Sequence, residues 1–432
     1  AVVAQVRRSF CTYLASLPPA MSSPWRAYGA GAPRVLEGVK VVELATVIAA
    51  PSCCALLSDM GATVIKVEGM GIGDSWRLQN YTPDGAAAEW GCGPHFVNNN
   101  RGKKSVQLNV KDKTHLAALK KLLAAADVFV TNVRPAALER SGLDYPTLAK
   151  EFPSMIYAIC LAWGLEGPQK DDLGYDLGAF WAAGGMMDFS KDSDDADVGT
   201  FPPGLGDHVT GVQLAAAISM ALYHRERTGQ AQLVDACLLR SAIWGMAFPL
   251  MNTANSPGKK FVRRPRTDAF NETMNCYKCG DGNWLQLLGL DTKGFMPKMI
   301  QALGLDASKV KELNNRQIIE LFDNNFAKHP ISYWEERLQA AGMWYTRAKR
   351  LDEVIQDAQV LADGGIVPVP WWKLKVAGSP IKLGCSDRHG PAGPPPAPGQ
   401  HTASVLKEVG VDDTSIAKIM QDQDAARQRS KL

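Results

Sequence analysis

The stretch from Val39 to Glu68 constrains the fold of this chain more than any other part of its sequence. Val39 to Leu44 has the continuous apolar pattern of a buried strand, and Thr63 to Glu68 has it again. Between them, Pro51 to Met60 reads as a helix that ends at Gly61. A strand, a helix and a second strand in this order form a βαβ unit with two parallel strands. The folded part of the chain therefore begins with the unit from which parallel sheets are built.

The same alternation of helix and strand continues for about two hundred residues. A helix is predicted over His115 to Ala126, and strands over Asp127 to Thr131 and Met155 to Trp163. The best-defined helix is expected over Thr210 to Arg227, and Gln232 to Cys237 reads as a strand that returns to the sheet. These patterns predict an α/β fold with a Rossmann-like parallel sheet.

The length of 432 residues favours two domains, because the chain is longer than a domain with a single hydrophobic core usually is. The sequence pattern changes after Asn255, where a basic loop, a hairpin and amphipathic helices follow. A smaller α+β domain is therefore expected as an insertion in the large one. The predicted division is a targeting or disordered segment at 1–36, a large Rossmann-like domain from 37–255 and 375–425, a small domain at 260–370 and a tail at 426–432.

Charge and hydropathy argue against two classes of partner. Lys and Arg total 47 against 44 Asp and Glu, and a net charge of +3 does not provide the field that nucleic-acid binding needs. No apolar stretch reaches the roughly 18 to 20 residues that span a bilayer. We therefore expect neither a nucleic acid nor a membrane as a partner.

Nine cysteines are scattered over the chain, and their odd number fits reduced thiols better than a disulfide framework. Cys276 and Cys279 have the spacing of a redox or zinc motif, but no second Cys or His pair lies near them in the sequence. Because Gly280-Asp281-Gly282 follows as a turn, a strand that leads into a hairpin is the favoured interpretation. No metal site is predicted.

Both ends of the chain carry possible targeting signals. Residues 1–36 contain arginines among Ser, Ala and Tyr but no acid, which is typical of an organellar presequence, and an unprocessed N-terminus is the alternative interpretation. The last three residues, Ser430-Lys431-Leu432, match the peroxisomal address that an import receptor reads. We expect a peroxisomal location through this C-terminus, with a mitochondrial location as the alternative.

Two short motifs place acidic residues where chemistry can occur. Gly206-Asp207 precedes Thr210-Gly211 and the long helix, so the Asp207 carboxylate is expected at a positive helix end. Asp is also a favoured N-cap residue, and a helix that begins near His208 to Thr210 could use Asp207 only as a cap. Upstream lies Gly174-Tyr175-Asp176, and the carboxylate there could likewise bond only a backbone amide.

Together with the run from Leu36 to Leu44 and with Ala49-Ala50-Pro51, these motifs resemble the class III CoA-transferase family, which also contains acyl-CoA racemases. The resemblance extends from about Leu36 to Met420. It implies a large domain built from both chain ends and two ring-like subunits that interlock as a homodimer. It also implies acyl-CoA and a carboxylic acid as substrates, with no tightly bound cofactor.

The resemblance assigns catalytic roles to residues of both motifs. Asp207 matches the nucleophile of the transferases, which carries CoA as a covalent aspartyl-CoA thioester, and Asp176 matches an acidic position that assists the acyl intermediates. His208 is interpreted as a bystander, because adjacent residues point apart. The racemases carry His where this chain has Tyr175, since proton transfer at one carbon needs a base on each face. A tyrosine ordinarily titrates near pH 10 but donates well to an oxyanion, so transfer is favoured. The alternatives are an alpha-methylacyl-CoA racemase and a catalytically silent acyl-CoA-binding homologue.

The resemblance also implies contacts to CoA along three segments. The turn after the first strand is expected to hold the pantetheine and nucleotide, and the basic Asn-Arg-Gly-Lys-Lys-Ser run to meet the phosphates. Without the resemblance, a run of charged residues of this kind would be interpreted as a solvent-exposed face of the protein. The predicted CoA-binding residues are Val47, Ile48, Ala49, Arg101, Lys103, Lys104, Leu108, Asn132, Val133, Ala137 and Arg140.

Three departures from the formyl-CoA transferases argue against oxalate and formate as substrates. Gly69 stands where those enzymes have Arg, and Leu173 where they have Lys. Their glycine-rich loop has no counterpart between Pro257 and Tyr277. The glycines after the second strand do not indicate a dinucleotide site either, because no helix-opening pattern follows them.

Overall fold

The computed structural model describes residues 34–79, 92–259, 261–369, 371, 374–383 and 392–429. The N-terminal segment up to residue 33 and the Ser430-Lys431-Leu432 sequence lie outside the described residues, so the expected targeting signals stay predictions. The chain divides into two compact units. The larger contains residues 1–186, 201–250 and 358–432, and the smaller contains residues 187–200 and 251–357.

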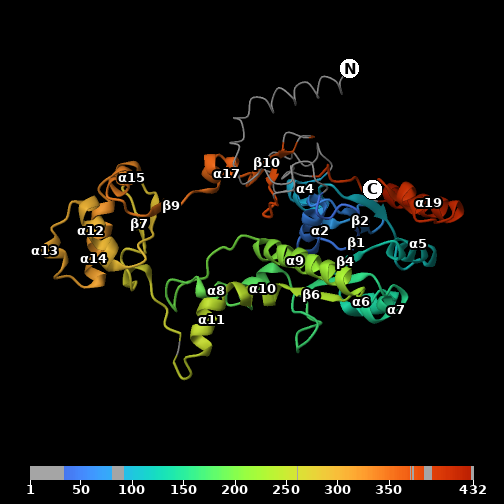
Figure 1. Ribbon diagram of the computed structural model, residues 1–432, viewed down its shortest axis with the longest axis horizontal. Helices are drawn as coiled ribbons and strands as arrows, with labels where there is room; N and C mark the ends of the chain where they lie inside the picture. The colour runs from blue at the N-terminus through green and yellow to red at the C-terminus, as the bar shows by residue number, and fades with distance from the viewer. Residues whose placement is uncertain are drawn as a thin grey trace, which may run out of the picture. The chain divides into compact units, whose positions relative to one another are not determined.

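A six-stranded sheet forms the centre of the larger unit, and all of its pairings are parallel (Figure 1). Its strands are β1 (Lys40–Leu44), β2 (Thr63–Glu68), β3 (Lys104–Gln107), β4 (Val128–Thr131), β5 (Ile156–Leu161) and β6 (Leu233–Cys237). They lie in the order β3-β2-β1-β4-β5-β6. The predicted α/β fold with a parallel sheet is confirmed. The order reverses direction between β1 and β4, and at such a switch point the carboxyl ends of the strands leave a crevice.

Helices cover both faces of this sheet. Successive residues of each strand point to opposite sides, and apolar residues on both sides pack against helices. Val41 packs on one face with α2 (Ala49–Asp59) and α9 (Leu205–Thr228). Val42 packs on the other face with α5 (Lys113–Ala124), α18 (Thr402–Glu408) and α19 (Asp413–Arg429). The C-terminal helices thus return to the sheet that the N-terminal half begins, and α19 lies beside α5 in Figure 1.

Helices α2 and α9 pack against each other at short range through Gly211. A Cβ atom at this position would lie 2.1 Å from Ser52 Oγ and 2.8 Å from the Ala49 carbonyl oxygen. Glycine therefore lets α9 approach the start of α2, which follows β1 directly. This close contact brings the first turn of α9 to the carboxyl end of β1.

The remaining elements of the larger unit are mostly short. A two-stranded antiparallel sheet of β10 (Ile366–Val369) and β11 (Leu374–Ala377) packs on α4 (Pro94–Asn100). The others are η2 (Ser75–Leu78), α6 (Pro135–Ser141), α7 (Tyr145–Glu151), η3 (Asp176–Ala182), α10 (Leu238–Gly245) and α17 (Ala358–Ala362). Two further helices, α8 (Met186–Phe189) and α11 (Ala247–Ala254), run across the boundaries between the units.

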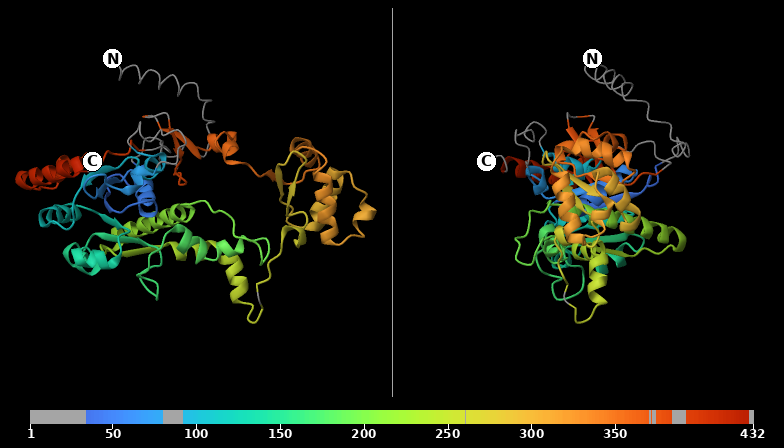
Figure 2. Two further views of the ribbon diagram at one scale, coloured as in Figure 1. Left: turned by 180° about the vertical axis from the view of Figure 1, so that it is seen from behind. Right: turned by 90° about the vertical axis from the view of Figure 1, so that its left-hand side faces the viewer.

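The smaller unit is an α+β structure with its own core (Figure 2). Strands β7 (Cys276–Lys278), β8 (Trp284–Leu287) and β9 (Tyr345–Arg347) form an antiparallel sheet, and the aromatic rings of Tyr277 and Phe326 stack beneath it. The predicted hairpin at Cys276 and Cys279 is confirmed. The other elements are η4 (Arg266–Asp268), α12 (Thr292–Leu303), α13 (Ala307–Val310), α14 (Asn315–Phe326), α15 (Ile331–Ala340) and α16 (Leu351–Val354). Among the described residues of the chain, no helix has the length and apolar content that a bilayer span needs.

Candidate active site

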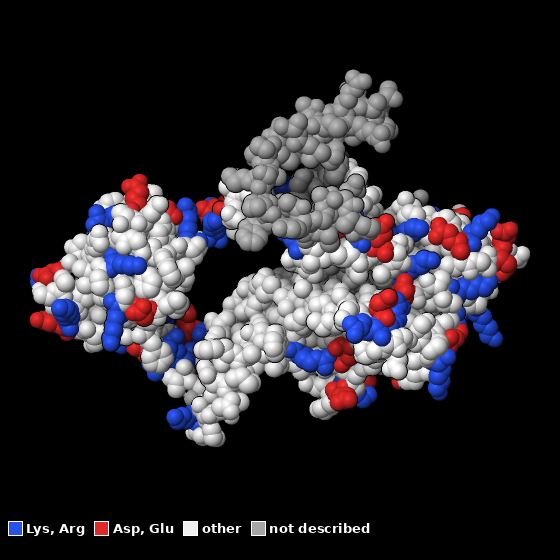
Figure 3. Space-filling model, viewed as in Figure 1, with Lys and Arg blue, Asp and Glu red and all other residues white. Residues whose placement is uncertain are grey.

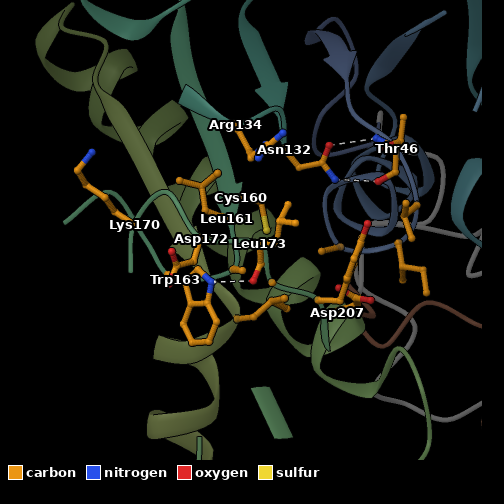
Figure 4. A pocket seen from close by; sticks show the side chains of 17 residues that line it. Thr46, Asn132, Arg134, Cys160, Leu161, Trp163, Lys170, Asp172, Leu173 and Asp207 are labelled. Carbon is orange, nitrogen blue, oxygen red and sulfur yellow. Dashed lines mark hydrogen bonds between the residues drawn. The ribbon is translucent and has the colours of Figure 1, made fainter. Parts of the chain in front are cut away.

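A pocket of about 230 Å³ lies at the switch point of the large sheet (Figure 4). Its walls come from segments that follow β1, β4, β5 and β6, together with the loop before η3 and the first turn of α9. The lining residues used below are Thr46, Val47, Ile48, Ala49, Asn132, Arg134, Cys160, Trp163, Lys170, Tyr175 and Asp207. Figure 4 shows Asp207 on one side of the pocket and Trp163 and Lys170 on the other.

The turn after β1 forms one wall of the pocket and is held from two sides. The Asn132 side chain accepts from the Thr46 N–H at 3.1 Å and donates to the Thr46 carbonyl oxygen at 2.8 Å. On the other side, the Val47 N–H donates to Asp74 Oδ1 at 3.3 Å. These bonds hold Val47 at a φ of +71°, which is a strained conformation for a β-branched residue.

Buried charges lie directly beneath this turn. Lys66 Nζ is 2.8 Å from Glu43 Oε1 and 3.0 Å from Asp74 Oδ2, and it donates to the Ala45 carbonyl oxygen at 2.8 Å. Burial opposes the charge of Lys66, but the carboxylates of Glu43 and Asp74 raise the pKa of its ammonium overall. Lys103 Nζ completes the cluster at 2.6 Å from Glu43 Oε2. Asp74 therefore links the buried ion cluster to the strained turn of the pocket.

Asp207 lies within the first turn of α9, not at its N-cap. The predicted start near Thr210 is corrected, because Gly204 adopts a left-handed φ of +81° and α9 begins at Leu205. Asp176 takes the capping role across space: its Oδ2 accepts from the Gly204 N–H at 2.7 Å, and the backbone N–H groups of Gly206 and Asp207 also lower its pKa. Burial nevertheless raises the pKa of Asp176 overall. The Asp176 carboxylate therefore occupies the N-terminal end of α9, and no described residue donates a hydrogen bond to the Asp207 carboxylate.

The side chain of Asp207 is correspondingly easy to protonate. Burial, followed by the negative charge of Asp176, raises its pKa to about 7. Because burial leaves its carboxylate less stabilised by solvent than an exposed one, this carboxyl group is about half ionised at neutral pH. Such a group combines the charge that nucleophilic attack requires with a partly dehydrated setting.

Close packing around Gly206 explains why the residue before Asp207 is a glycine. A Cβ atom at this position would lie 2.2 Å from Phe180 Cγ and 2.3 Å from Asp176 Oδ1. Only glycine lets the first turn of α9 approach the π-helix η3, which begins at Asp176. The two motifs that the sequence separates by about thirty residues are therefore in direct contact.

Tyr175 lines the same pocket as Asp207 but is largely exposed, with 73% of its surface accessible. Its hydroxyl is thus free to reach a bound molecule. Cys160 also lines the pocket, but burial raises the pKa of its thiol well above the ordinary value. A neutral, buried thiol is a poor nucleophile, so the carboxylate of Asp207 is the better candidate for covalent chemistry.

The structure places the predicted CoA-binding residues in different surroundings. Val47, Ile48, Ala49 and Asn132 all line the pocket. Val133, which precedes α6, and Ala137, within that helix, are half-buried, whereas Arg140 is exposed in its last turn. These positions are compatible with a ligand that extends from the pocket along α6.

The basic run is used differently from the expectation. Arg101 is 2.7 Å from Asp59 Oδ2, Lys103 is paired with Glu43, and both side chains are buried. The strand β3 begins at Lys104 and draws this segment into the sheet, so the two charges are neutralised inside the unit and do not face a phosphate. Lys104 is partly exposed at 3.5 Å from Glu408, and Leu108 packs in the core.

Several pocket residues escaped the sequence analysis, among them Thr46, Arg134, Trp163 and Lys170. Thr46 and Arg134 follow the carboxyl ends of β1 and β4, and this position alone could have singled them out once the strand order was known. His208, interpreted as a bystander, lines a different cavity, and its Nδ1 lies 2.7 Å from the Gly204 carbonyl oxygen.

Comparison with known proteins gives a consistent result. Residues 36–402 match the family model described as CoA-transferase family III. The chain is 31% identical to (R)-2-hydroxy-4-methylpentanoate CoA-transferase of Clostridioides difficile, over 88% of this chain and 97% of that protein. It is 30% identical to succinyl-CoA:glutarate CoA-transferase of Mus musculus, over 89% of each chain. A CAIB/BAIF family protein from Brucella suis superposes with a TM-score of 0.74 and 25% identity, covering 87% of this chain and 100% of that one.

Proposed function

The chain belongs to CoA-transferase family III, and on that premise we propose that Asp207 carries CoA as a covalent aspartyl thioester between a donor acyl-CoA and an acceptor carboxylic acid. Transfer of CoA is the activity for which the relatives reported above are named. The covalent route, the residues that perform it and the identity of the acids are the proposed part.

One observation carries the proposal: Asp207, with a pKa of about 7, lines the pocket that also contains the turn Val47 to Ala49. The pocket lies where open parallel sheets bind their ligands, outside the carboxyl ends of the strands. A thioester whose CoA follows this turn would bring its carbonyl carbon to the Asp207 carboxylate.

The proposed reaction proceeds through two anhydrides. The Asp207 carboxylate attacks the donor thioester and forms an aspartyl acyl anhydride, and CoA leaves as its thiolate. The thiolate then attacks the aspartyl carbonyl, which releases the donor acid and forms the aspartyl-CoA thioester. The acceptor carboxylate attacks this thioester to form a second anhydride, and the returning thiolate takes the acceptor acyl group and frees Asp207. Water must be excluded throughout, because it would hydrolyse either anhydride.

The other residues of the two motifs support this chemistry. The Tyr175 hydroxyl can donate to the oxyanion that develops in each step. Asp176 positions the first turn of α9 through the Gly204 N–H and raises the pKa of Asp207 through its charge. Racemisation would need a second base beside the α-carbon; the racemases have a histidine at the position of Tyr175, and no histidine is among the described residues that line the pocket. We therefore expect no exchange of the substrate α-proton with D₂O during turnover.

An isotope experiment tests the covalent route. If the acceptor acid is labelled with ¹⁸O in both carboxylate oxygens, the second anhydride leaves one labelled oxygen on Asp207. Mass spectrometry of the Asp207 peptide should then show a gain of about 2 Da after a single turnover, and repeated turnover should bring the gain toward about 4 Da. A peptide that stays unlabelled after many turnovers would show that the carboxylate of Asp207 does not exchange oxygen with the acceptor, and the proposal would fail.

The raised pKa of Asp207 predicts the pH dependence of activity. Only the ionised form attacks, so kcat/KM for the donor should rise with pH and reach half of its plateau near pH 7. In Asp176→Asn the neighbouring charge is lost, and the midpoint should move to lower pH. An unchanged midpoint in this variant would contradict the coupling of the two carboxyls. The same group should stabilise the fold most below about pH 4, and this contribution should be lost as pH rises through about 7.

We further propose that the protein forms a homodimer. Large apolar side chains are exposed along α9 and α10, including Met220, Tyr223 and Trp244, and the surface over these helices has few charges in Figure 3. Exposed apolar patches of this kind are typical of association surfaces. Sedimentation equilibrium should therefore give a mass twice that of one chain.

A further inference from the structure

Thr210 carries a buried hydroxyl group for which the fold provides no partner. The residue lies in α9 and is fully buried, and its Oγ1 has no hydrogen-bond partner among the described residues. A serine or threonine within a helix often donates to the carbonyl oxygen four residues earlier, as Ser219 and Thr228 of the same helix do. Thr210 makes no such bond to Gly206. Because an unpartnered buried hydroxyl lowers stability, its presence needs a reason other than stability.

Asp207, one turn before Thr210, has the complementary need. No described residue donates a hydrogen bond to its carboxylate. Residues three apart on a helix are neighbours, with Cβ atoms about 5 to 6 Å from each other. Helical side chains also lean toward the N-terminus of their helix, so the Thr210 side chain extends toward the turn that carries Asp207. A donor without an acceptor and an acceptor without a donor therefore lie on neighbouring turns of α9.

The two residues differ in their access to the substrate. Asp207 lines the pocket, whereas Thr210 is not among the described residues that line it, so Thr210 lies on the helix side of the nucleophile. In the aspartyl anhydride and thioester, the group bound to the aspartyl carbonyl carbon extends into the pocket. The acyl group is planar, so its carbonyl oxygen points away from that group and toward the helix. Each attack on this carbon gives the oxygen a negative charge, which a donor on the helix side would stabilise.

We propose that the Thr210 hydroxyl donates a hydrogen bond to the aspartyl carbonyl oxygen of Asp207 while the anhydride and the thioester interconvert. This inference rests on the proposed covalent route and adds a catalytic residue to it. When the thioester forms, the CoA thiolate attacks the aspartyl carbon, the C–S bond forms, the C–O bond to the donor acid breaks, and the acid leaves as its carboxylate. The proton stays on Thr210, and its hydrogen bond strengthens as the oxygen becomes negative. A donor fixed in a buried site is effective because water does not compete with it.

Thr210→Val tests the proposal, because it keeps the branched shape of the side chain and removes the hydroxyl. Each protein is mixed with acetyl-CoA, butanoyl-CoA or succinyl-CoA and quenched at successive times, and the CoA adduct on the Asp207 peptide is quantified by mass spectrometry. The adduct should form about 100-fold more slowly in Thr210→Val than in wild type. Thr210→Ser keeps the hydroxyl and should stay within about fivefold of wild type.

Stability should change in the opposite direction to the rate. Thr210→Val removes an unpartnered buried polar group, so its thermal midpoint should rise by about 1 to 2 °C. Thr228→Val is the matched control in the last turn of α9, where the hydroxyl is exposed and bonded to the His224 carbonyl oxygen. It should leave the rate of adduct formation within about twofold and should not raise the thermal midpoint.

Two results would overturn the inference. If Thr210→Val forms the adduct within about threefold of the wild-type rate, the hydroxyl has no part in the reaction. If Thr210→Val and Thr210→Ser lose the same amount, the position acts through packing and not through its hydroxyl. In both cases wild type still forms the adduct and ¹⁸O still reaches Asp207. Failure of the proposed function would instead appear in wild type, as an Asp207 peptide with neither adduct nor label, and would remove the intermediate that Thr210 serves.

Discussion

Asp207→Asn is expected to lower kcat/KM for CoA transfer by at least about 10⁴-fold, because an amide cannot form the anhydride or the thioester. The fold should be retained. The carboxyl is half protonated near pH 7, so an amide of the same shape is close to the form that the structure already accommodates. The rate is measured by separating acyl-CoA products, and the thermal midpoint is measured on the same samples. Asp207→Ala should give the same loss and excludes recovery of activity through deamidation.

Asp171→Asn is the matched control for this variant. Asp171 is exposed beside Lys170 and is not among the pocket-lining residues, so the same chemical change should leave kcat/KM within about twofold. An Asp207→Asn enzyme that keeps more than about a tenth of the wild-type rate would contradict the role of Asp207 as nucleophile.

Lys66→Met is expected to have the largest effect on stability, a loss of about 3 to 5 kcal/mol in the free energy of unfolding. The variant keeps the length of the side chain but leaves the Glu43 and Asp74 carboxylates in a buried site with one cation fewer. Because Asp74 also bonds the Val47 N–H, the strained turn should loosen, and CoA binding should weaken with it. Urea unfolding followed by circular dichroism measures the first effect, and titration with CoA measures the second.

Two further variants sharpen this test. Lys40→Met removes an exposed lysine at the start of the neighbouring strand β1 and should cost less than about 0.5 kcal/mol. Adding Asp74→Asn to Lys66→Met should recover part of the lost stability, because it removes the one carboxylate that loses its ion pair, whereas Glu43 still pairs with Lys103. A loss below about 1 kcal/mol in Lys66→Met would show that the buried cluster does not hold this part of the fold.

The large sheet could be predicted because its strands are buried on both faces. Such strands appear in the sequence as continuous apolar runs, as in Val39 to Leu44 and Met155 to Trp163. The start of α9 could not be predicted, because it depends on a residue that is distant in the sequence. Asp176 supplies the cap that Gly204 and the helix end need, and nothing in the local sequence shows that the two segments meet.

The candidate site was predicted unevenly for a similar reason. Asp207 and the turn after β1 follow from local motifs and from the position of strand ends. The roles of Arg101 and Lys103 depend on Asp59 and Glu43, which lie about forty to sixty residues earlier in the chain and meet them only in the fold.

Chemical trapping on the Asp207 peptide tests the central claim most directly. The purified protein is incubated briefly with a panel of acyl-CoAs that includes dicarboxylic and branched ones, then quenched with or without hydroxylamine and digested for mass spectrometry. The account predicts a CoA adduct on the peptide that contains Asp207, and its replacement by a hydroxamate when hydroxylamine is present. CoA binding with no adduct and no hydroxamate across the whole panel would contradict it.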